Sequence, residues 1–248
     1  MILSYILWTK FNTNKQIINK SHRMKLTIEK NFLTINQSTE KIINITYEKE
    51  QNSLLEFIIE RIIVNKKTAD ALDGFIYQKL LKTNQQKIRK KLIQHFPNGI
   101  VNLKSSSNIN YEPLQKLLIN ENFKEADKLT NQYLCELVKI NTSIEKKWLY
   151  FTDIQFLPTE DLFTLDFLWK VYSRGKFGFS VQKQIWIKSN KNWDILWEKI
   201  SWASNGSMKR YPQEFQWTIK APEGHLPLFN QLRGTQTLSY LFKNITWE

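Results

Sequence analysis

The stretch FTLDFLWKVYSRGKFGFSVQ, residues 163–182, decides the fold that the sequence predicts. Apolar residues around its first half form a stripe that is too broad for a surface helix: Leu162, Leu165, Phe167, Leu168, Trp169 and Val171. We therefore expect a helix at the centre of a core, with Thr159 as its N-cap and its end at residues 173–175, SRG. Phe177 and Phe179 follow around a glycine, and we expect both rings to be exposed for binding.

Helical periodicity continues on both sides of this stretch. It predicts helices over residues 53–63, 68–82, 85–96, 111–120, 123–139, 193–200 and 232–242. Ser53 and Glu56 have the spacing of a capping box at the start of the first of these helices. Residues 179–188 fit either a strand or a helix capped by Ser180, and residues 25–35 and 45–49 could form short strands. The predicted fold class is all-α.

The chain divides into three parts in this interpretation. Residues 1–46 are a polar extension of uncertain order, residues 47–105 form a small bundle like a helical-hairpin repeat, and residues 106–248 form a larger core. The boundary near residue 105 rests on Pro97-Asn98-Gly99 and the Ser/Asn-rich segment VNLKSSSNIN, residues 101–110.

Positive charge is concentrated in the first part of the chain. Residues 1–105 hold 18 Lys and Arg against 8 Asp and Glu, a net charge of +10, whereas residues 106–248 hold 18 against 15, a net charge of +3. Such a surface attracts nucleic acid, anionic membranes or acidic proteins. However, 30 Lys against 6 Arg, with abundant Asn and Ile, is what an A·T-rich coding sequence imposes. We therefore favour a solvated lysine-rich surface over a nucleic-acid interface.

No residue pattern in the sequence indicates catalysis or a metal site. Cys135, the single cysteine, cannot form an intramolecular disulfide and lies in a helical pattern typical of a buried, inert thiol. The three histidines, His22, His95 and His225, lack the spacing of metal ligands, and no glycine-rich phosphate loop occurs. The apolar start MILSYILW is too short to span a membrane and lacks the features of a signal peptide. We expect a protein that is not an enzyme.

Longer segments around the opening stretch carry a family resemblance. With WLYFTDIQFLPTEDL (148–162) before it and RYPQEFQWTIKAPEGHLPLFNQLRG (210–234) after it, the stretch resembles the core domain of the Genomes-Uncoupled-Four family. NYEPLQKLLINENFKEADKLTNQYLCEL (110–137) and IWIKSNKNWDILWEKISW (185–202) extend the resemblance, which runs from near Ile109 to Trp247. Members of this family are porphyrin-binding accessories of magnesium chelatase in oxygenic phototrophs.

The resemblance implies a helix over residues 179–188 and a function. It implies binding of protoporphyrin IX or magnesium protoporphyrin IX, without catalysis, and stimulation of magnesium chelatase in chlorophyll synthesis. The implied protein partner is the large porphyrin-binding subunit of the chelatase. The implied location is the plastid, as a soluble protein or in peripheral contact with plastid membranes.

A tetrapyrrole is a flat apolar disc with two carboxylates, so its site needs aromatic and aliphatic side chains with cations at the rim. Residues 204–228 form a long loop that contains three prolines and several rings, which is typical of a functional loop. By resemblance, residues 204–217 form one lip of the cleft, to which Phe151 and Arg233 also belong. The predicted porphyrin-binding residues are Phe151, Phe177, Met208, Arg210, Tyr211, Phe215, Trp217, Leu226, Arg233 and Gln236.

Several alternatives stay open at this stage. Relatives often carry tryptophan where Met208 and Tyr211 stand, and some carry arginine where Gln236 stands, which puts affinity in question. Arg174 and Arg210 suit ion pairing at a helix end or on the surface as well as a ligand. We favour a hydrogen-bonded loop histidine over an axial metal ligand for His225. The alternative functions are a helical-repeat scaffold without a small ligand and a basic nucleic-acid binder.

Overall fold

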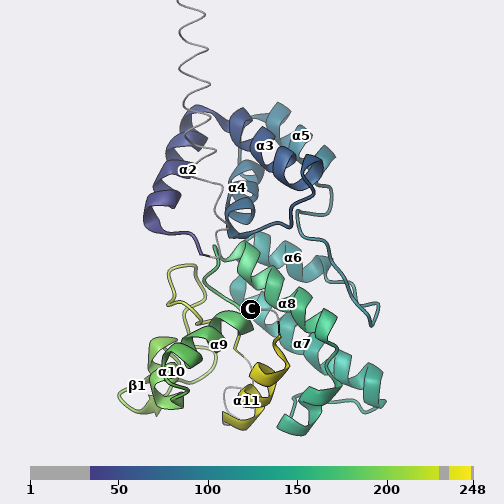
Figure 1. The fold of residues 1–248 in the computed structure, drawn as a ribbon, viewed down its shortest axis with the longest axis vertical. Helices are drawn as coiled ribbons and strands as arrows, with labels where there is room; N and C mark the ends of the chain where they lie inside the picture. The colour runs from purple at the N-terminus through teal and green to yellow at the C-terminus, as the bar shows by residue number, and fades with distance from the viewer. Residues whose placement is uncertain (1–33, 229–234, 247–248) are drawn as a thin grey trace, which may run out of the picture. The chain divides into compact units, whose positions relative to one another are not determined.

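The computed structural model describes residues 34–228 and 235–246, which belong to one compact unit (Figure 1). The first helices are α2 (Gln37–Lys49), α3 (Gln51–Ile59), the π-helix η1 (Glu60–Val64), α4 (Ala71–Leu81) and α5 (Gln86–His95). The later ones are α6 (Glu112–Ile119), α7 (Phe123–Thr142), the 3₁₀-helix η2 (Phe151–Phe156), α8 (Thr159–Tyr172), α9 (Phe179–Lys188), α10 (Trp193–Lys199) and α11 (Thr235–Asn244). The strands β1 (Ala203–Ser204) and β2 (Ser207–Met208) pair as a hairpin. The predicted all-α class is confirmed.

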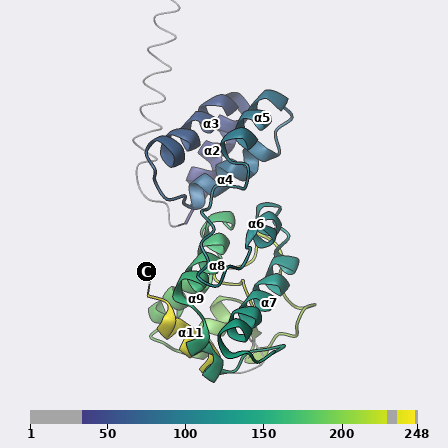
Figure 2. The ribbon, with the colours of Figure 1, turned by 90° about the vertical axis from the view of Figure 1, so that its right-hand side faces the viewer.

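Helices α2 to α5 pack against one another as a small bundle (Figure 2). Asp70 begins α4 with a capping box, because its carboxylate accepts from the backbone of Leu72 and Asp73 while Asp73 accepts from the backbone of Asp70. Arg61 of η1 is buried and forms ion pairs with Asp70 and Asp73 at 2.7 and 3.0 Å. These pairs tie the end of the α3–η1 segment to the start of α4.

Two local predictions in this bundle are wrong. Ser53 lies inside α3, which begins at Gln51 with Glu50 as its N-cap, so the expected capping box with Glu56 does not form. Residues 45–49 belong to α2 rather than to a strand, because Asn36 caps that helix and Ile43 faces the core. Helical structure therefore begins at Gln37, inside the segment assigned to the extension. The other strand candidate, residues 25–35, lies almost wholly outside the described residues.

The bundle packs closely on the helices that follow it. Gly74 of α4 lies so near α8 that a Cβ there would overlap the carbonyl oxygen of Val171. The buried Gln78 side chain donates to the carbonyl oxygens of Leu118 and Tyr172 at 3.2 and 3.1 Å. The core of residues 106–248 therefore continues into the bundle, and the boundary near residue 105 stays a prediction.

The segment predicted as a connector is held on α8. Asp161 is fully buried and accepts hydrogen bonds from the Ser105 and Ser106 hydroxyls and from the Tyr111 hydroxyl. The Ser-rich composition thus supplies donors for a buried carboxylate, which would otherwise be strongly unfavourable in the core.

Helix α8 lies at the centre of the core, as the sequence predicts, and it begins at Thr159, so this residue is helical rather than the N-cap. Trp169 is fully buried and stacks on Phe123 with 6.0 Å between ring centroids. The expectation that Phe177 and Phe179 are exposed is wrong. Both are buried, and Phe177 packs edge-on against Phe123 at 5.3 Å, which encloses the aromatic core around α8.

Segment 179–188 is the helix α9, as the resemblance implies. Gly178 precedes it with φ +138°, and a Cβ there would lie 2.7 Å from the Asp166 carboxylate. That carboxylate accepts from the Ser180 backbone N–H at 2.9 Å, so the cap comes from α8 rather than from Ser180.

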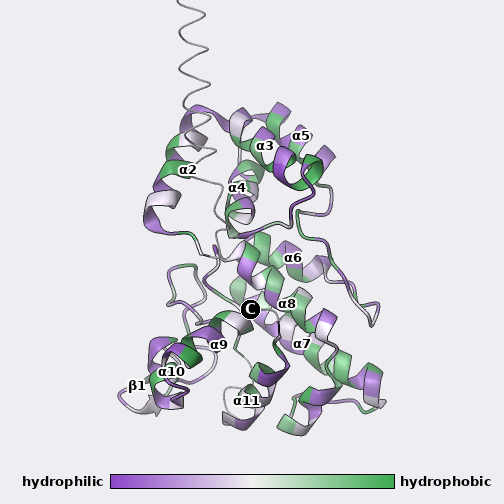
Figure 3. Cartoon of the chain, viewed as in Figure 1, coloured by the Kyte–Doolittle hydropathy of each residue, from purple (hydrophilic) through white to green (hydrophobic). Residues whose placement is uncertain are grey.

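Figure 3 shows hydrophobic and hydrophilic residues alternating along the neighbouring α7, consistent with one buried face. Among the described residues, no helix is long and apolar enough to cross a membrane.

Candidate functional site

The exposed loop 203–217 follows α10 and starts with the β1–β2 hairpin. Asn205 and Gly206 form its turn with φ of +51° and +75°, as an Asn-Gly hairpin requires. Behind the hairpin, the buried Trp202 stacks almost parallel on Trp197 with 5.4 Å between ring centroids. The loop therefore begins from a rigid aromatic base.

Aromatic side chains gather near the end of this loop. Tyr211 lies edge-on to Trp217 with 5.9 Å between centroids, and Phe215 lies 6.4 Å from Trp217. The Trp217 indole N–H donates to the Pro212 carbonyl at 3.0 Å, which fixes the ring. Met208 and Tyr211 remain 41% and 40% exposed, unusual for apolar side chains held by such a base.

Residues 218–228, in contrast, are held against the core by the half-buried Lys176 and the buried Gln182. Lys176 donates to the carbonyls of Ile219 and Ala221 at 2.7 and 2.6 Å, and burial lowers the pKa of its ammonium. Gln182 donates to the carbonyls of Gly224 and Pro227 at 3.0 and 2.9 Å. These bonds give the exposed loop a fixed support.

His225 belongs to this support. Its Nδ1 lies 2.6 Å from the Ile200 carbonyl oxygen, and its Nε2 accepts from the Gln216 backbone N–H at 3.0 Å. Nδ1 therefore carries the proton, and burial lowers the pKa of the ring, so the neutral form is favoured. With both nitrogens occupied, His225 is the hydrogen-bonded loop histidine that the sequence favours.

Helix α7 holds Leu228, the last residue of the supported segment 218–228. The Asp127 carboxylate accepts from the Leu228 backbone N–H at 2.6 Å, and the Asn131 amide donates to the Leu228 carbonyl at 3.2 Å. Burial raises the pKa of Asp127 to about 8. Burial also raises the pKa of the Tyr211 hydroxyl, and the Asp127 carboxyl adds to that rise.

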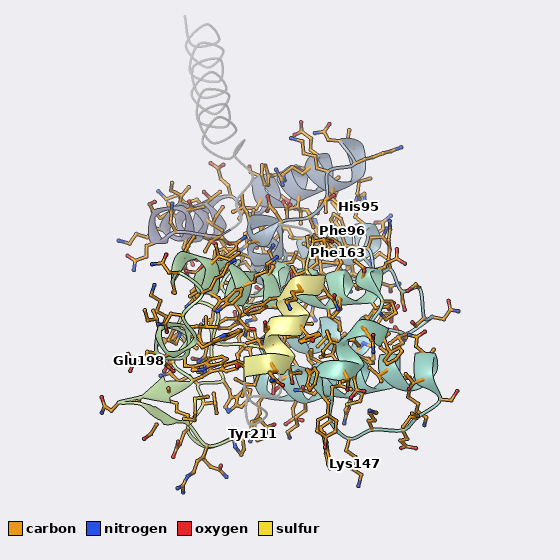
Figure 4. All side chains as sticks on the ribbon, turned by 60° about the horizontal axis from the view of Figure 1, so that its bottom comes forward. His95, Phe96, Lys147, Phe163, Glu198 and Tyr211 are labelled. Atoms are coloured by element: carbon orange, nitrogen blue, oxygen red, sulfur yellow. The ribbon has the colours of Figure 1, made fainter. Side chains whose placement is uncertain are left out.

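An open cavity of about 850 Å³ runs along the C-terminal half of α7. Its lining comes from residues 131–140 of α7 and from the segment 143–147, and it includes Cys135 and Lys147. Asn131 lines the cavity and also donates a hydrogen bond to the carbonyl of Leu228, the last residue of the supported segment. In Figure 4, which brings the bottom of the molecule forward, Tyr211 and Lys147 both lie along the lower edge of the view. The cavity is thus within the size range of ligand pockets, and its lining is polar or charged apart from Cys135 and Ile140.

Charges around this cavity differ in how they are paired. Lys146 forms an ion pair with Asp153 at 2.6 Å, and Lys139 lies 3.4 Å from Glu145. Lys147, which lines the cavity, and Arg210, which lies on loop 203–217, are exposed and have no ion-pair partner among the described residues. Cys135 is half-buried, and burial raises its pKa, which disfavours a reactive thiolate.

The structure brings together part of the predicted set. Met208, Arg210, Tyr211, Phe215 and Trp217 share the loop. Phe151 lies instead on η2, where it packs on Tyr240 of α11 at 5.3 Å, and Gln236 is exposed on the first turn of α11. Phe177 and Leu226 are fully buried beneath the surface, and Arg233 lies outside the described residues.

Other residues were assigned differently by sequence reasoning or missed by it. Arg174 is an ion-pairing residue, since it binds Glu40 at 2.6 Å and lies over the Phe75 ring. The cavity lining on α7 was missed, because helical spacing alone does not show which polar face is hollowed. The signal that could have found it is the run Glu145-Lys146-Lys147 directly after α7.

These features define a class of protein: an all-α protein with an exposed aromatic loop on a rigid support and an open cavity that has lysines in its lining. Residues 104–244 match the GUN4-like family, over more than half of the chain, and the chain belongs to this family. The ycf53 protein of Pyropia yezoensis is 43% identical over 234 residues, which cover 93% of this chain and 98% of that protein. A tetrapyrrole-binding protein of Arabidopsis thaliana, described as chloroplastic, is 34% identical and covers 52% of this chain and 51% of its own.

A solved structure of GUN4 from Chlamydomonas reinhardtii is also similar to this chain. It has a TM-score of 0.52 and 34% identity, and the likeness covers 59% of this chain and 96% of that one. The fold of the core is therefore that of a GUN4 structure.

Proposed function

We propose that this protein binds a tetrapyrrole between loop 203–217 and the cavity on α7. The observation that carries the proposal is membership of the GUN4-like family, together with an exposed aromatic loop and an open cavity of about 850 Å³ on α7. The Arabidopsis thaliana relative is a tetrapyrrole-binding protein, which supports the proposal. A flat apolar ligand would gain from covering Met208, Tyr211 and Trp217, because burial of apolar surface contributes roughly 25 cal/mol per Å².

The proposed ligand is protoporphyrin IX or magnesium protoporphyrin IX. Its propionates would bind cations at the rim, for which Lys147 and Arg210 are available and Arg233 is proposed, with Gln236 as a neutral neighbour. Phe151 would extend the apolar wall. Phe177, Phe215 and Leu226 are proposed to act through packing, because all three are buried.

The proposed role is that of a non-catalytic accessory of magnesium chelatase in the plastid. A carrier that presents a sparingly soluble porphyrin to the large chelatase subunit would raise the rate where substrate is limiting. The chloroplastic description of the Arabidopsis thaliana relative supports the location. We expect stimulation of magnesium insertion to be greatest at low porphyrin, and an unchanged rate at every porphyrin concentration would remove the accessory role alone.

A porphyrin titration followed by Soret absorbance tests the binding proposal. The full chain should red-shift and sharpen the Soret band to saturation. Tyr211→Ala should bind about 5- to 30-fold more weakly, the loss of a partly buried aromatic contact of about 1–2 kcal/mol. Phe163→Ala is the matched control, since Phe163 is similarly exposed at 37% but lies on α8. Equal weakening by both substitutions, or no spectral change with the parent, would refute the site or the function.

A further inference from the structure

A second cavity, of about 260 Å³, lies where the N-terminal bundle meets α6. Its walls come from the C-terminal part of α4 and the following Lys82, from α6 and the following Asn120, from Arg89 of α5 and from the turn 97–99. It shares no lining residue with the cavity on α7. At roughly 30 Å³ per water, its volume equals about nine water molecules, which suits a small metabolite and not a tetrapyrrole.

Buried amides give this cavity a fixed wall. Gln78 donates through Nε2 to the carbonyl oxygens of Leu118, Ile119 and Tyr172 at 3.1–3.2 Å. Gln115 accepts from the Tyr172 hydroxyl at 2.8 Å and donates to the Asn98 carbonyl. Both side chains are almost fully buried, so the wall is ordered before a ligand arrives.

The charge of the lining is positive. Lys82, Arg89 and Lys116 supply three positive charges and Glu112 one negative charge, a net of +2. Glu112 lies 3.8 Å from Lys116, while Lys82 and Arg89 have no ion-pair partner among the residues that the structure describes. Helices α4 and α6 end at this cavity, and each C-terminus contributes about half a negative charge. The balance remains near +1.

We propose that this cavity binds a small organic anion, a carboxylate or phosphate of metabolite size, with Arg89 as its principal contact. A guanidinium suits either acid because its donors match two oxygens at once. The walls come from both the bundle and α6, so the bound anion holds the two together. This binding is separate from that of the tetrapyrrole, and neither proposal depends on the other.

The test is a thermal-shift titration of the full chain with inorganic phosphate, succinate and glutamate at constant ionic strength. At least one of these probes should raise the melting temperature saturably, and the separate arms distinguish phosphate from carboxylate. Arg89→Ala should weaken that probe's apparent affinity by about tenfold or more, the loss of a charged hydrogen bond. Lys90→Ala removes the same charge from the same helix outside the cavity, and it should change the affinity by less than about twofold.

Three results would overturn the proposal. They are the absence of a saturable shift with every probe, an Arg89→Ala protein that binds like the parent, and an equal loss in Lys90→Ala, which would indicate general charge screening. Because Arg89 is exposed, its substitution leaves the core intact, and circular dichroism verifies the fold. Porphyrin titration of the same samples should give parental affinity, which separates this site from the proposed tetrapyrrole cleft.

Discussion

Two segments that follow each other in the chain, loop 203–217 and residues 218–228, both contain proline and apolar side chains. They differ in side-chain exposure and in how their backbone is held. In the loop, Met208 and Tyr211 are exposed. In the following segment, Leu226 and Leu228 are buried, and Lys176 and Gln182 hold the backbone. The difference shows that composition alone does not separate a binding surface from its support. What separates them is that side chains of the neighbouring helical core, Lys176 and Gln182, bond to the backbone carbonyls of the second segment.

Removal of Trp202, which belongs to the aromatic base of the loop, should have the largest effect on the free energy of unfolding. Trp202 is fully buried and donates to the His225 carbonyl at 2.8 Å. We expect Trp202→Ala to lower the free energy of unfolding by about 3–5 kcal/mol, as a large cavity in a core does. Urea unfolding measures this, with Trp217→Ala as the control on the loop side, expected to cost less. An equal cost for both would mean that the two regions do not differ.

Loss of a polar side chain that holds residues 218–228 should have the second-largest effect on the free energy of unfolding. Gln182→Ala leaves the Gly224 and Pro227 carbonyls without their side-chain donor, and an unsatisfied buried group costs about 1–3 kcal/mol. For the two carbonyls together, we expect the free energy of unfolding to fall by about 2–4 kcal/mol. Ser180, also buried, provides a matched change as Ser180→Ala, because no partner of its hydroxyl is found among the described residues. If both substitutions cost the same, the holder role of Gln182 is wrong.

The Asp127 bond to Leu228 should make stability depend on pH. The pKa of Asp127 is raised to about 8 in the folded state by burial, so between the unfolded value near 4 and pH 8 the folded state binds the extra proton. Stability from this group is therefore lost as pH rises, by at most about 1.4 kcal/mol per pH unit.

Asp127→Asn tests this directly, since it mimics the protonated acid and can still accept from Leu228. The difference in urea midpoint between variant and parent should grow in favour of the variant from pH 5 to pH 8. A difference that stays constant over this range would contradict the raised pKa.

The smallest effect on stability is expected on the loop surface. Tyr211→Ala should change the free energy of unfolding by no more than about 0.5 kcal/mol, as for surface positions, although it weakens porphyrin binding. A thermal melt of the porphyrin-free protein measures the first quantity. A loss comparable with that of Gln182→Ala would place Tyr211 in the support and remove it from the proposed ligand surface.

The sequence predicts much of the fold because helical periodicity is strong around α8 and in α7. It mispredicts where partners distant in sequence decide the outcome. Phe177 reads as exposed beside Lys176 and Gly178, but Phe123 and Trp169 enclose it. Ser180 reads as a cap, yet Asp166 performs that role from another helix. The loop was predicted from its prolines and rings, whereas the cavity on α7 depends on how segment 143–147 folds back, which local pattern does not encode.

The central proposal is that a tetrapyrrole binds between loop 203–217 and the cavity on α7, and Cys135 reports on that cavity directly. It lines the cavity and is the single cysteine of the chain, so a maleimide modifies one defined position. The measurement is the rate of Cys135 alkylation at fixed pH with and without saturating porphyrin, with saturation verified by Soret absorbance. The account predicts a rate several-fold slower with porphyrin, because the bound disc covers the thiol. An unchanged rate in a sample whose Soret band shows full binding would place the ligand elsewhere.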